Sequence, residues 1–396
     1  MEKILEISNE NSAKAIKYLQ KSTAPRCIYM LRMYPKGLSN DPVLFAALRE
    51  FLKIPNIISN VRIDTSQSGL KTCEDFDAYI KLIVDTLSIF EGVSVEELHI
   101  WDPHVISAAS NIEPLKHYFR TTTSFKKICP NFDRIIDFDL LQQLDLNQHV
   151  EKICLNLGAI SDGNHDVISP TSTITKLGWF RIRDRFETNE IVRYIDMIAS
   201  QPHLTKIALE NFKLTPAIIN SLMAIIQKGH LKKLKLINYS LSDGASEYLN
   251  DLSKIILASL TSVFDTGALS KYIFYNLDST TTLTNLDLSG NINCYNFNID
   301  EIIRELSKTN IVIFDCCRLA TCAHPKFKFS FTDKLKIEES WNKILSDNYS
   351  LTKFNVSILD KETSKWFGLE LNDLTNRNKN VLERFRFTKH LKTIPY

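Results

Sequence analysis

The most tightly grouped metal-ligating side chains of this sequence are three thiols and an imidazole. Cys316, Cys317, Cys322 and His324 lie within nine residues, and thiolate sulfur and imidazole nitrogen are ligands that zinc prefers in proteins. Structural zinc sites, however, usually combine two ligand pairs that lie far apart in the sequence. These four residues are local, so a buried group of metal-free thiols is the alternative, and we predict neither a metal nor a cofactor.

Signatures of enzyme active sites are missing from the sequence. It has no Gly-x-x-x-x-Gly-Lys phosphate loop, no Gly-x-Gly-x-x-Gly dinucleotide motif, no Gly-x-Ser-x-Gly nucleophile elbow and no His-Glu-x-x-His metalloprotease motif. Glycine is also scarce, with 11 residues in 396, which leaves few positions for loops that bind phosphate. We therefore predict that the protein is not an enzyme.

Composition and charge narrow the class of protein. Of the 396 residues, 44% are hydrophobic, and 48 basic residues against 46 acidic ones give a net charge of +2. Such apolar content excludes a disordered or collagen-like chain. The near-neutral charge argues against a general nucleic-acid binder. Length alone is compatible with two or three domains.

Nothing in the sequence predicts export or a membrane span. The first seven residues, Met1 to Ile7, lack the apolar run of a signal peptide. The most apolar stretch, 216–226, is far shorter than the roughly 20 residues of a spanning helix. Eight cysteines in so long a chain favour a reducing compartment. We expect a cytoplasmic protein, or one delivered into the cytoplasm of a host cell.

The sequence contains a repeat, and its strands and helices must position any functional side chains. Short segments with the spacing apolar-x-x-apolar-x-apolar recur about every 29 residues, each followed by a stretch with helical spacing. Asp41-Pro42 and Thr215-Pro216 have the residue types that begin helices. We predict that the repeating units are centred on Leu5, Ile28, Val61, Leu98, Ile128, Ile153, Leu177, Ile207, Leu234, Val263, Leu286, Ile311, Phe354 and Phe385.

One unit, 283–291, has the full pattern Leu-x-x-Leu-x-Leu-x-x-Asn. In this pattern the chain resembles the leucine-rich repeat family, in particular its ribonuclease-inhibitor-like members. The resemblance implies an α/β solenoid of horseshoe shape, with a parallel concave β-sheet and helices on the convex side. It implies a single array over residues 1–396, with about 13 to 14 units. Residues 318–335 are either an insertion or a compressed repeat.

Residues that alternate with the apolar positions should line the concave face. Five consecutive units have lysine just before the central apolar residue, and such a column favours an anionic neighbour. The alternative is a solvated column that keeps the sheet soluble. Trp179 is expected to point into the core. The predicted partner-binding residues are Lys127, Lys152, Lys176, Lys206, Lys233, Arg62, His99, Trp101, Lys235, Phe264, Asp287, Asn355 and Arg386.

These features predict a module that binds a protein partner on its concave face, and a lysine column that takes part in binding indicates an acidic surface on that partner. A stand-alone irregular repeat protein without a signal peptide resembles the leucine-rich repeat effectors that intracellular bacteria inject into host cells. The alternative is an adaptor that recognises substrates for an enzyme such as a ubiquitin ligase, or an enzyme whose site has no motif. Nucleic acid is not expected as a partner, and no membrane span is expected.

Overall fold

The computed structural model describes residues 4–7, 11–21, 27–35, 41–53, 57–64, 73–101, 109–132, 138–158, 174–183, 186–280, 282–288, 309, 311–315 and 353–355. The chain divides into two compact units. The first comprises residues 1–186 and 197–204, and the second comprises residues 187–196 and 205–396.

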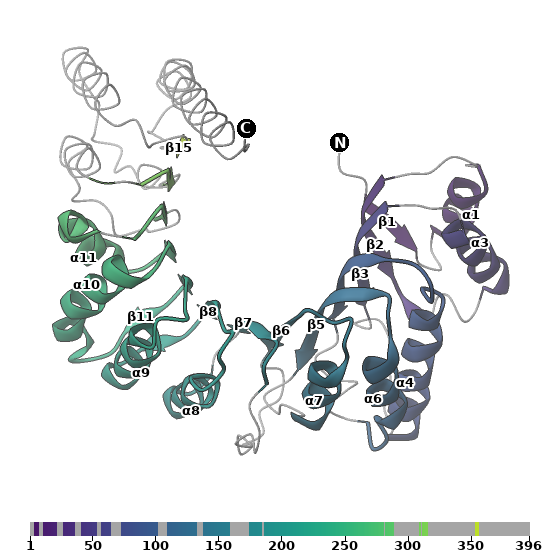
Figure 1. Ribbon diagram of the computed structural model, residues 1–396, viewed down its shortest axis with the longest axis horizontal. Coiled ribbons are helices and arrows are strands. Elements are labelled where there is room, and N and C mark those ends of the chain that lie inside the picture. Colours follow the sequence, from purple (N-terminus) through teal and green to yellow (C-terminus); the bar gives the residue numbers. More distant parts are fainter. Residues whose placement is uncertain are drawn as a thin grey trace, which may run out of the picture. The chain divides into compact units, whose positions relative to one another are not determined.

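The first unit is a parallel β-sheet with helices along one face. Its strands pair in chain order, each parallel to the next. The strands are β1 (Ile4–Ile7), β2 (Cys27–Met33), β3 (Ile57–Asp64), β4 (Val95–Trp101), β5 (Phe125–Phe132), β6 (Lys152–Leu157) and β7 (Leu177–Ile182). The helices are α1 (Ser12–Gln20), α3 (Pro42–Lys53), α4 (Cys73–Ser88), α6 (Glu113–Thr121) and α7 (Phe138–Leu146). Figure 1 shows these helices along one side of the strands.

The second unit repeats this arrangement. Its parallel strands, again in chain order, are β8 (Lys206–Glu210), β10 (Lys233–Ile237), β12 (Ser262–Asp265), β13 (Asn285–Asp287), β14 (Ile313–Asp315) and β15 (Lys353–Asn355). Two short strands, β9 (Lys213–Leu214) and β11 (Ser240–Leu241), form a separate parallel pair. The helices are α9 (Pro216–Gln227), α10 (Leu249–Ser259) and α11 (Leu269–Tyr275), whereas α8 (Thr188–Ile198) contributes residues to both units.

The strand order distinguishes this architecture from other parallel α/β folds. In a doubly wound sheet the order reverses at a switch point, whereas here neighbours in the chain are neighbours in each unit's sheet. Each strand–helix repeat is too small to form a core alone, so neighbouring repeats within a unit must stack. The predicted α/β class is confirmed, and the sheets are compatible with a repeat solenoid.

Register identifies the apolar positions that build the cores. In the first unit Leu31, Val61, Leu98, Ile128 and Ile153 occupy one row across the strands, and all five are at most 1% exposed. Burying such a side chain contributes about 1.5–3 kcal/mol.

Two predicted repeat centres were wrong by three residues. Leu31, and not Ile28, pairs with Leu5 and Val61. Phe314, and not Ile311, pairs with Leu286. The repeated pattern has apolar residues three positions apart, so two alignments fit it equally well, and only strand pairing selects one.

Helix starts follow the predicted capping residues. Asp41 Oδ1 accepts a hydrogen bond from the Leu44 amide at 2.9 Å, immediately before α3. Thr215 Oγ1 accepts one from the Ile218 amide at 3.4 Å, before α9. Both predicted helix starts are confirmed. No helix in the described ranges is long and apolar enough to cross a bilayer.

A buried carboxyl group links β12 to α11 in the second unit. Asp265 is fully buried. Its Oδ2 accepts hydrogen bonds from the Ser270 hydroxyl at 2.5 Å and the Ser270 amide at 2.8 Å, and its Oδ1 accepts one from the Tyr239 hydroxyl at 2.9 Å. Burial raises the pKa of Asp265 to about 6, although these hydrogen bonds oppose the rise.

This raised pKa predicts a specific pH dependence of stability. A carboxyl whose pKa is higher in the fold than in the unfolded chain contributes stability that is complete below the unfolded pKa and is lost as the pH rises through the folded one. For Asp265 the loss extends from about pH 4 to about pH 6 and totals about 3 kcal/mol. Between pH 7 and pH 5 the wild type should therefore gain about 1 kcal/mol over Asp265→Asn.

Urea unfolding of both proteins at the two pH values measures this difference. The matched control is Asp251→Asn, an exposed position in α10, which should follow the wild type at both pH values. An equal pH dependence for wild type and Asp265→Asn would contradict the assignment.

Candidate functional site

The face of each sheet opposite the helices is called the open face here, because no described helix covers it (Figure 1). In the first unit, side chains alternate between the core and this face. Leu98 and Ile100 of β4 are buried against the helices, while Glu97, His99 and Trp101 are partly exposed. A central row of the open face crosses the sheet through Arg32, Arg62, His99, Cys129, Cys154 and Trp179.

A carboxylate from the neighbouring row, Glu97, meets the imidazole and the thiols of this row. Glu97 Oε1 accepts hydrogen bonds from Lys127 Nζ at 2.5 Å, His99 Nε2 at 2.9 Å and Cys129 Sγ at 3.1 Å. Cys129 also shares a hydrogen bond with Cys154 on the neighbouring strand. We call Glu97, His99, Cys129 and Cys154 the thiol cluster.

Electrostatics fix the charge of this cluster. Burial acts to raise the pKa of Glu97, but the hydrogen bonds from His99, Lys127 and Cys129 outweigh it and lower the pKa to about 2. Burial and the hydrogen bond to Cys154 raise the pKa of Cys129. The same hydrogen bond, with the charges of Lys127 and Lys152, lowers the pKa of Cys154. The cluster therefore places an ionised carboxylate beside a thiol whose pKa is lowered, in one partly buried site.

Beside the cluster, an indole ring lies between two arginines. The guanidinium carbon of Arg62 lies 4.5 Å from the centroid of the Trp101 ring, and that of Arg183 lies 4.2 Å from it. Cation–π contacts of this kind contribute about 0.5–2 kcal/mol. Trp101 belongs to β4 and Arg183 directly follows β7, so this contact bridges the two strands between them, β5 and β6.

Two asparagines on β5 and β6 are buried although they face away from the helices. Asn131 and Asn156 are paired in register and are 4% and 6% exposed. Within the described part of the chain, their Oδ1 atoms have no hydrogen-bond partner. The indole and guanidinium groups that bridge these strands explain the burial, because they exclude water from this part of the open face.

The expectation that Trp179 points into the core was wrong. A bulge shifts the register after Ile153, so that Cys154 pairs with Trp179 and Leu155 with Phe180. Phe180 is therefore buried, while Trp179 is partly exposed. The Lys127 ammonium lies 5.6 Å from the centroid of the Trp179 ring. The extra residue in the bulge is Gly178, where an added Cβ would lie 2.4 Å from Lys152 Cε.

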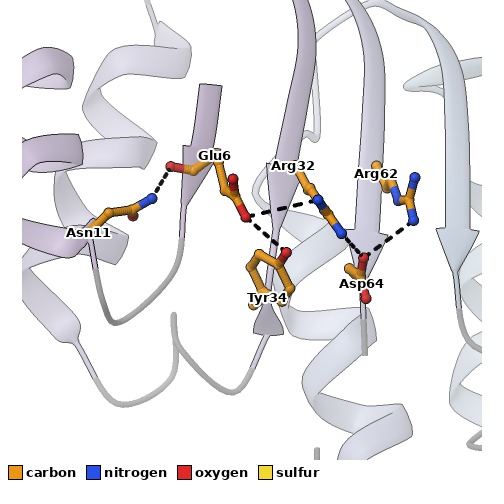
Figure 2. Close-up of polar contacts among 6 residues, drawn as sticks. All are labelled: Glu6, Asn11, Arg32, Tyr34, Arg62 and Asp64. Carbon is orange, nitrogen blue, oxygen red and sulfur yellow. Dashed lines mark hydrogen bonds and ion pairs between the residues drawn. The ribbon is translucent and has the colours of Figure 1, made fainter. Parts of the chain in front are cut away.

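At the first strands of the sheet, the open face has an ion-pair network (Figure 2). Arg32 Nη2 lies 2.6 Å from Asp64 Oδ2, and Arg62 Nη2 lies 3.4 Å from the same oxygen. The Tyr34 hydroxyl donates to Glu6 Oε1 at 2.9 Å. Asp64 is 1% exposed, so the two arginines neutralise a buried charge and are held in place by it.

The predicted lysine column is only partly a surface feature. Lys127 pairs in register with Lys152, and Lys206 with Lys233. Lys127, however, is bound to Glu97, and the Lys176 ammonium donates to the backbone oxygen of Asn147. At least two of the five lysines are thus engaged within the fold, which lowers the mutual repulsion that the sequence suggested.

The other predicted binding residues occupy the second unit. Lys235 pairs in register with Phe264, and Phe264 with Asp287. The Lys235 ammonium lies 5.0 Å from the centroid of the Phe264 ring. Asn355 lies in β15 opposite Asp315. Arg386, the interval 318–335 and the cluster of Cys316, Cys317, Cys322 and His324 lie outside the described residues.

Sequence reasoning missed the thiol cluster although it named most of its surroundings. His99, Cys129 and Cys154 occupy the same position in three consecutive repeats, about 27 residues apart on average. A search for closely spaced ligands found only the local group at 316–324. Their shared position in successive units marks them as neighbours on one face, but sequence reasoning interpreted that position only as part of a protein-binding surface.

Of the comparisons with known proteins, only the search of solved structures found matches. Neither the protein-family models nor the characterised proteins that were searched match the sequence. Among solved structures, the chain is similar to a Bacteroides fragilis protein determined as a structural-genomics target. The two share 13% identity with a TM-score of 0.35, over 73% of this chain and 74% of that one.

Proposed function

We propose that the chain is a protein-binding repeat protein of the leucine-rich repeat kind, whose open face binds an acidic surface of a protein partner. One observation supports this most strongly: an indole ring held between two arginines, Arg62–Trp101–Arg183, on a sheet face that no described helix covers. Tryptophan and arginine are the residue types that most often dominate binding energy at protein interfaces.

The charge of the open face favours an acidic partner. In the described part of the first unit, three carboxylates of this face, Glu6, Asp64 and Glu97, are each within 4.0 Å of an arginine or lysine nitrogen. Cations outnumber these carboxylates in the first unit, where they are Arg32, Arg62, Lys127, Lys152, Arg181 and Arg183. The excess positive charge would steer an acidic surface toward this face and set its orientation.

A rigid face also suits a binding role. Arginine and lysine lose much rotamer entropy when they bind a partner. The contacts of Arg62 with Asp64 and Trp101, and of Lys127 with Glu97 and Trp179, already restrict these side chains in the free protein. Preorganisation of this kind lowers the entropic cost of association.

Charge reversal on the open face, compared with charge reversal on helix α1, tests the proposal. Partners are captured with the full chain from lysate, and their affinity is measured at low and high salt. Lys152→Glu combined with Lys233→Glu, on the open face, should weaken binding at least about tenfold at low salt. The matched control is Lys14→Glu with Lys17→Glu, at exposed positions of α1, and should bind like the wild type. Equal affinity of the two double variants would contradict the proposal.

A further inference from the structure

Three side chains with metal-binding atoms converge on the open face where β4 and β5 lie side by side. One ligand atom each from Glu97, His99 and Cys129 lies within 4.8 Å of the other two. Cys154 faces Cys129 from the next strand and shares a hydrogen bond with it. One sulfur, one imidazole nitrogen and one carboxylate oxygen thus surround one point, and the Cys154 sulfur lies next to the Cys129 sulfur.

We propose that this thiol cluster binds one zinc ion, with Cys129, His99 and Glu97 as three ligands and with Cys154, once its side chain turns toward the ion, as the fourth. Thiolate and imidazole ligands select zinc and similar transition metals, while Mg²⁺ and Ca²⁺ require oxygen ligands. Four protein ligands complete a tetrahedral shell and leave no position for substrate, which defines a structural site. Its role would be to clamp three adjacent strands at the centre of the open face. This inference does not depend on the proposed protein partner.

The distances fit such a site. Zinc bonds of about 2.0–2.3 Å in tetrahedral geometry separate neighbouring ligand atoms by about 3–4 Å. Glu97 Oε1 already lies 2.9 Å from His99 Nε2 and 3.1 Å from Cys129 Sγ. These contacts are bridged by protons on nitrogen and sulfur. A metal ion would replace those protons, so the ligand atoms need only a small outward adjustment, and binding should release protons.

The neighbouring charges complete the argument. Two thiolates and one carboxylate bring three negative charges, and Zn²⁺ offsets two of them. Lys127, whose ammonium lies 2.5 Å from Glu97 Oε1, supplies the remaining positive charge. A buried charge is tolerated when it is paired and hydrogen-bonded. The lysine is therefore compatible with the ion, because it neutralises the carboxylate that would be one of the ligands.

Cobalt(II) alone is the appropriate probe, because its absorption reports both thiolate ligation and geometry. Reduced, metal-free full-length protein should bind one equivalent with a sulfur-to-cobalt charge-transfer band and the intense visible bands of tetrahedral cobalt. Cys129→Ser with Cys154→Ser should abolish the charge-transfer band. His99→Ala should keep it but weaken cobalt binding more than about 100-fold, since even outer-shell partners of a metal are worth about 10- to 100-fold.

The local cysteines at 316–322 provide the matched control. Cys316→Ser with Cys317→Ser and Cys322→Ser should retain the full cobalt spectrum and its stoichiometry. Circular dichroism verifies that each variant is folded, and His99→Ala, whose side chain is 31% exposed, remains informative if the double cysteine variant does not fold. The proposal is overturned if the wild type shows no charge-transfer band, if the band survives in Cys129→Ser with Cys154→Ser, if His99→Ala binds cobalt as tightly as the wild type, or if the triple variant loses the band.

Discussion

Replacing Arg32 with leucine should lower the free energy of unfolding by about 3 kcal/mol. The reason is the charge left behind. Asp64 is 1% exposed and lies 2.6 Å from Arg32, so the variant removes the shorter of the two arginine contacts of a buried carboxylate and keeps the 3.4 Å contact to Arg62. Breaking a buried pair by removing one partner costs about 3–5 kcal/mol. The lower end applies here because Arg32 is 33% exposed. Urea unfolding followed by circular dichroism measures the change.

Two further variants separate the unpaired charge from lost packing. Arg32→Leu combined with Asp64→Leu removes both charges and should recover most of the lost stability, since replacing a buried pair by apolar residues is often neutral. Arg49→Leu alters an exposed arginine of α3 that stacks on Phe45 and should cost less than about 0.5 kcal/mol. A double variant less stable than Arg32→Leu would show that the ion pair is not the source of the effect.

The ion-pair network also explains why the arginines are suitable for binding. Arg32 and Arg62 share one carboxylate oxygen of Asp64, and Arg62 contacts Trp101 from its other side. Because Asp64 is buried, a side chain of the core positions the guanidinium groups of Arg32 and Arg62. Stability of the first unit and geometry of the open face thus depend on the same residues.

The sequence predicted the architecture well because one strong pattern repeats. Central residues such as Val61, Leu98 and Leu234 were assigned to the correct strand positions. Each repeat must bury an apolar residue at this position so that neighbouring repeats can stack. Ile28 and Ile311 were misplaced because the same pattern also fits three residues earlier than the true register. Pairing between strands, which is not local in the sequence, resolves that ambiguity.

The site was less predictable because it depends on irregularities. A bulge between β6 and β7 rotates Trp179 from the expected core position to the open face, and nothing in the apolar spacing signals one extra residue. Glu97 was not predicted at all. Its role follows from three donors on β4 and β5, and these contacts exist only after residues about 30 apart have been brought together.

Truncating Trp101 should weaken binding of an acidic protein partner by about 30- to 1,000-fold, equivalent to about 2–4 kcal/mol, if the open face is the interface. The ring is a large rigid anchor, and Arg62 and Arg183 lie against it at 4.5 Å and 4.2 Å. Trp101→Ala removes the anchor and also frees both arginines, which then lose entropy on binding.

The matched control is Tyr275→Ala in α11. Tyr275 is 57% exposed on a helix, so its truncation also removes an exposed aromatic ring but leaves the open face unchanged. Thermal unfolding verifies that both variants are folded. Arg183→Gln, which removes one cation and keeps the ring, should have a smaller effect of about tenfold.

The dissociation constant of Trp101→Ala, compared with that of Tyr275→Ala for the same captured partner, is therefore the decisive measurement. Binding on the open face predicts a loss of at least about 30-fold for Trp101→Ala and a change below about twofold for Tyr275→Ala. Similar affinities for the two variants would contradict a binding role for this face.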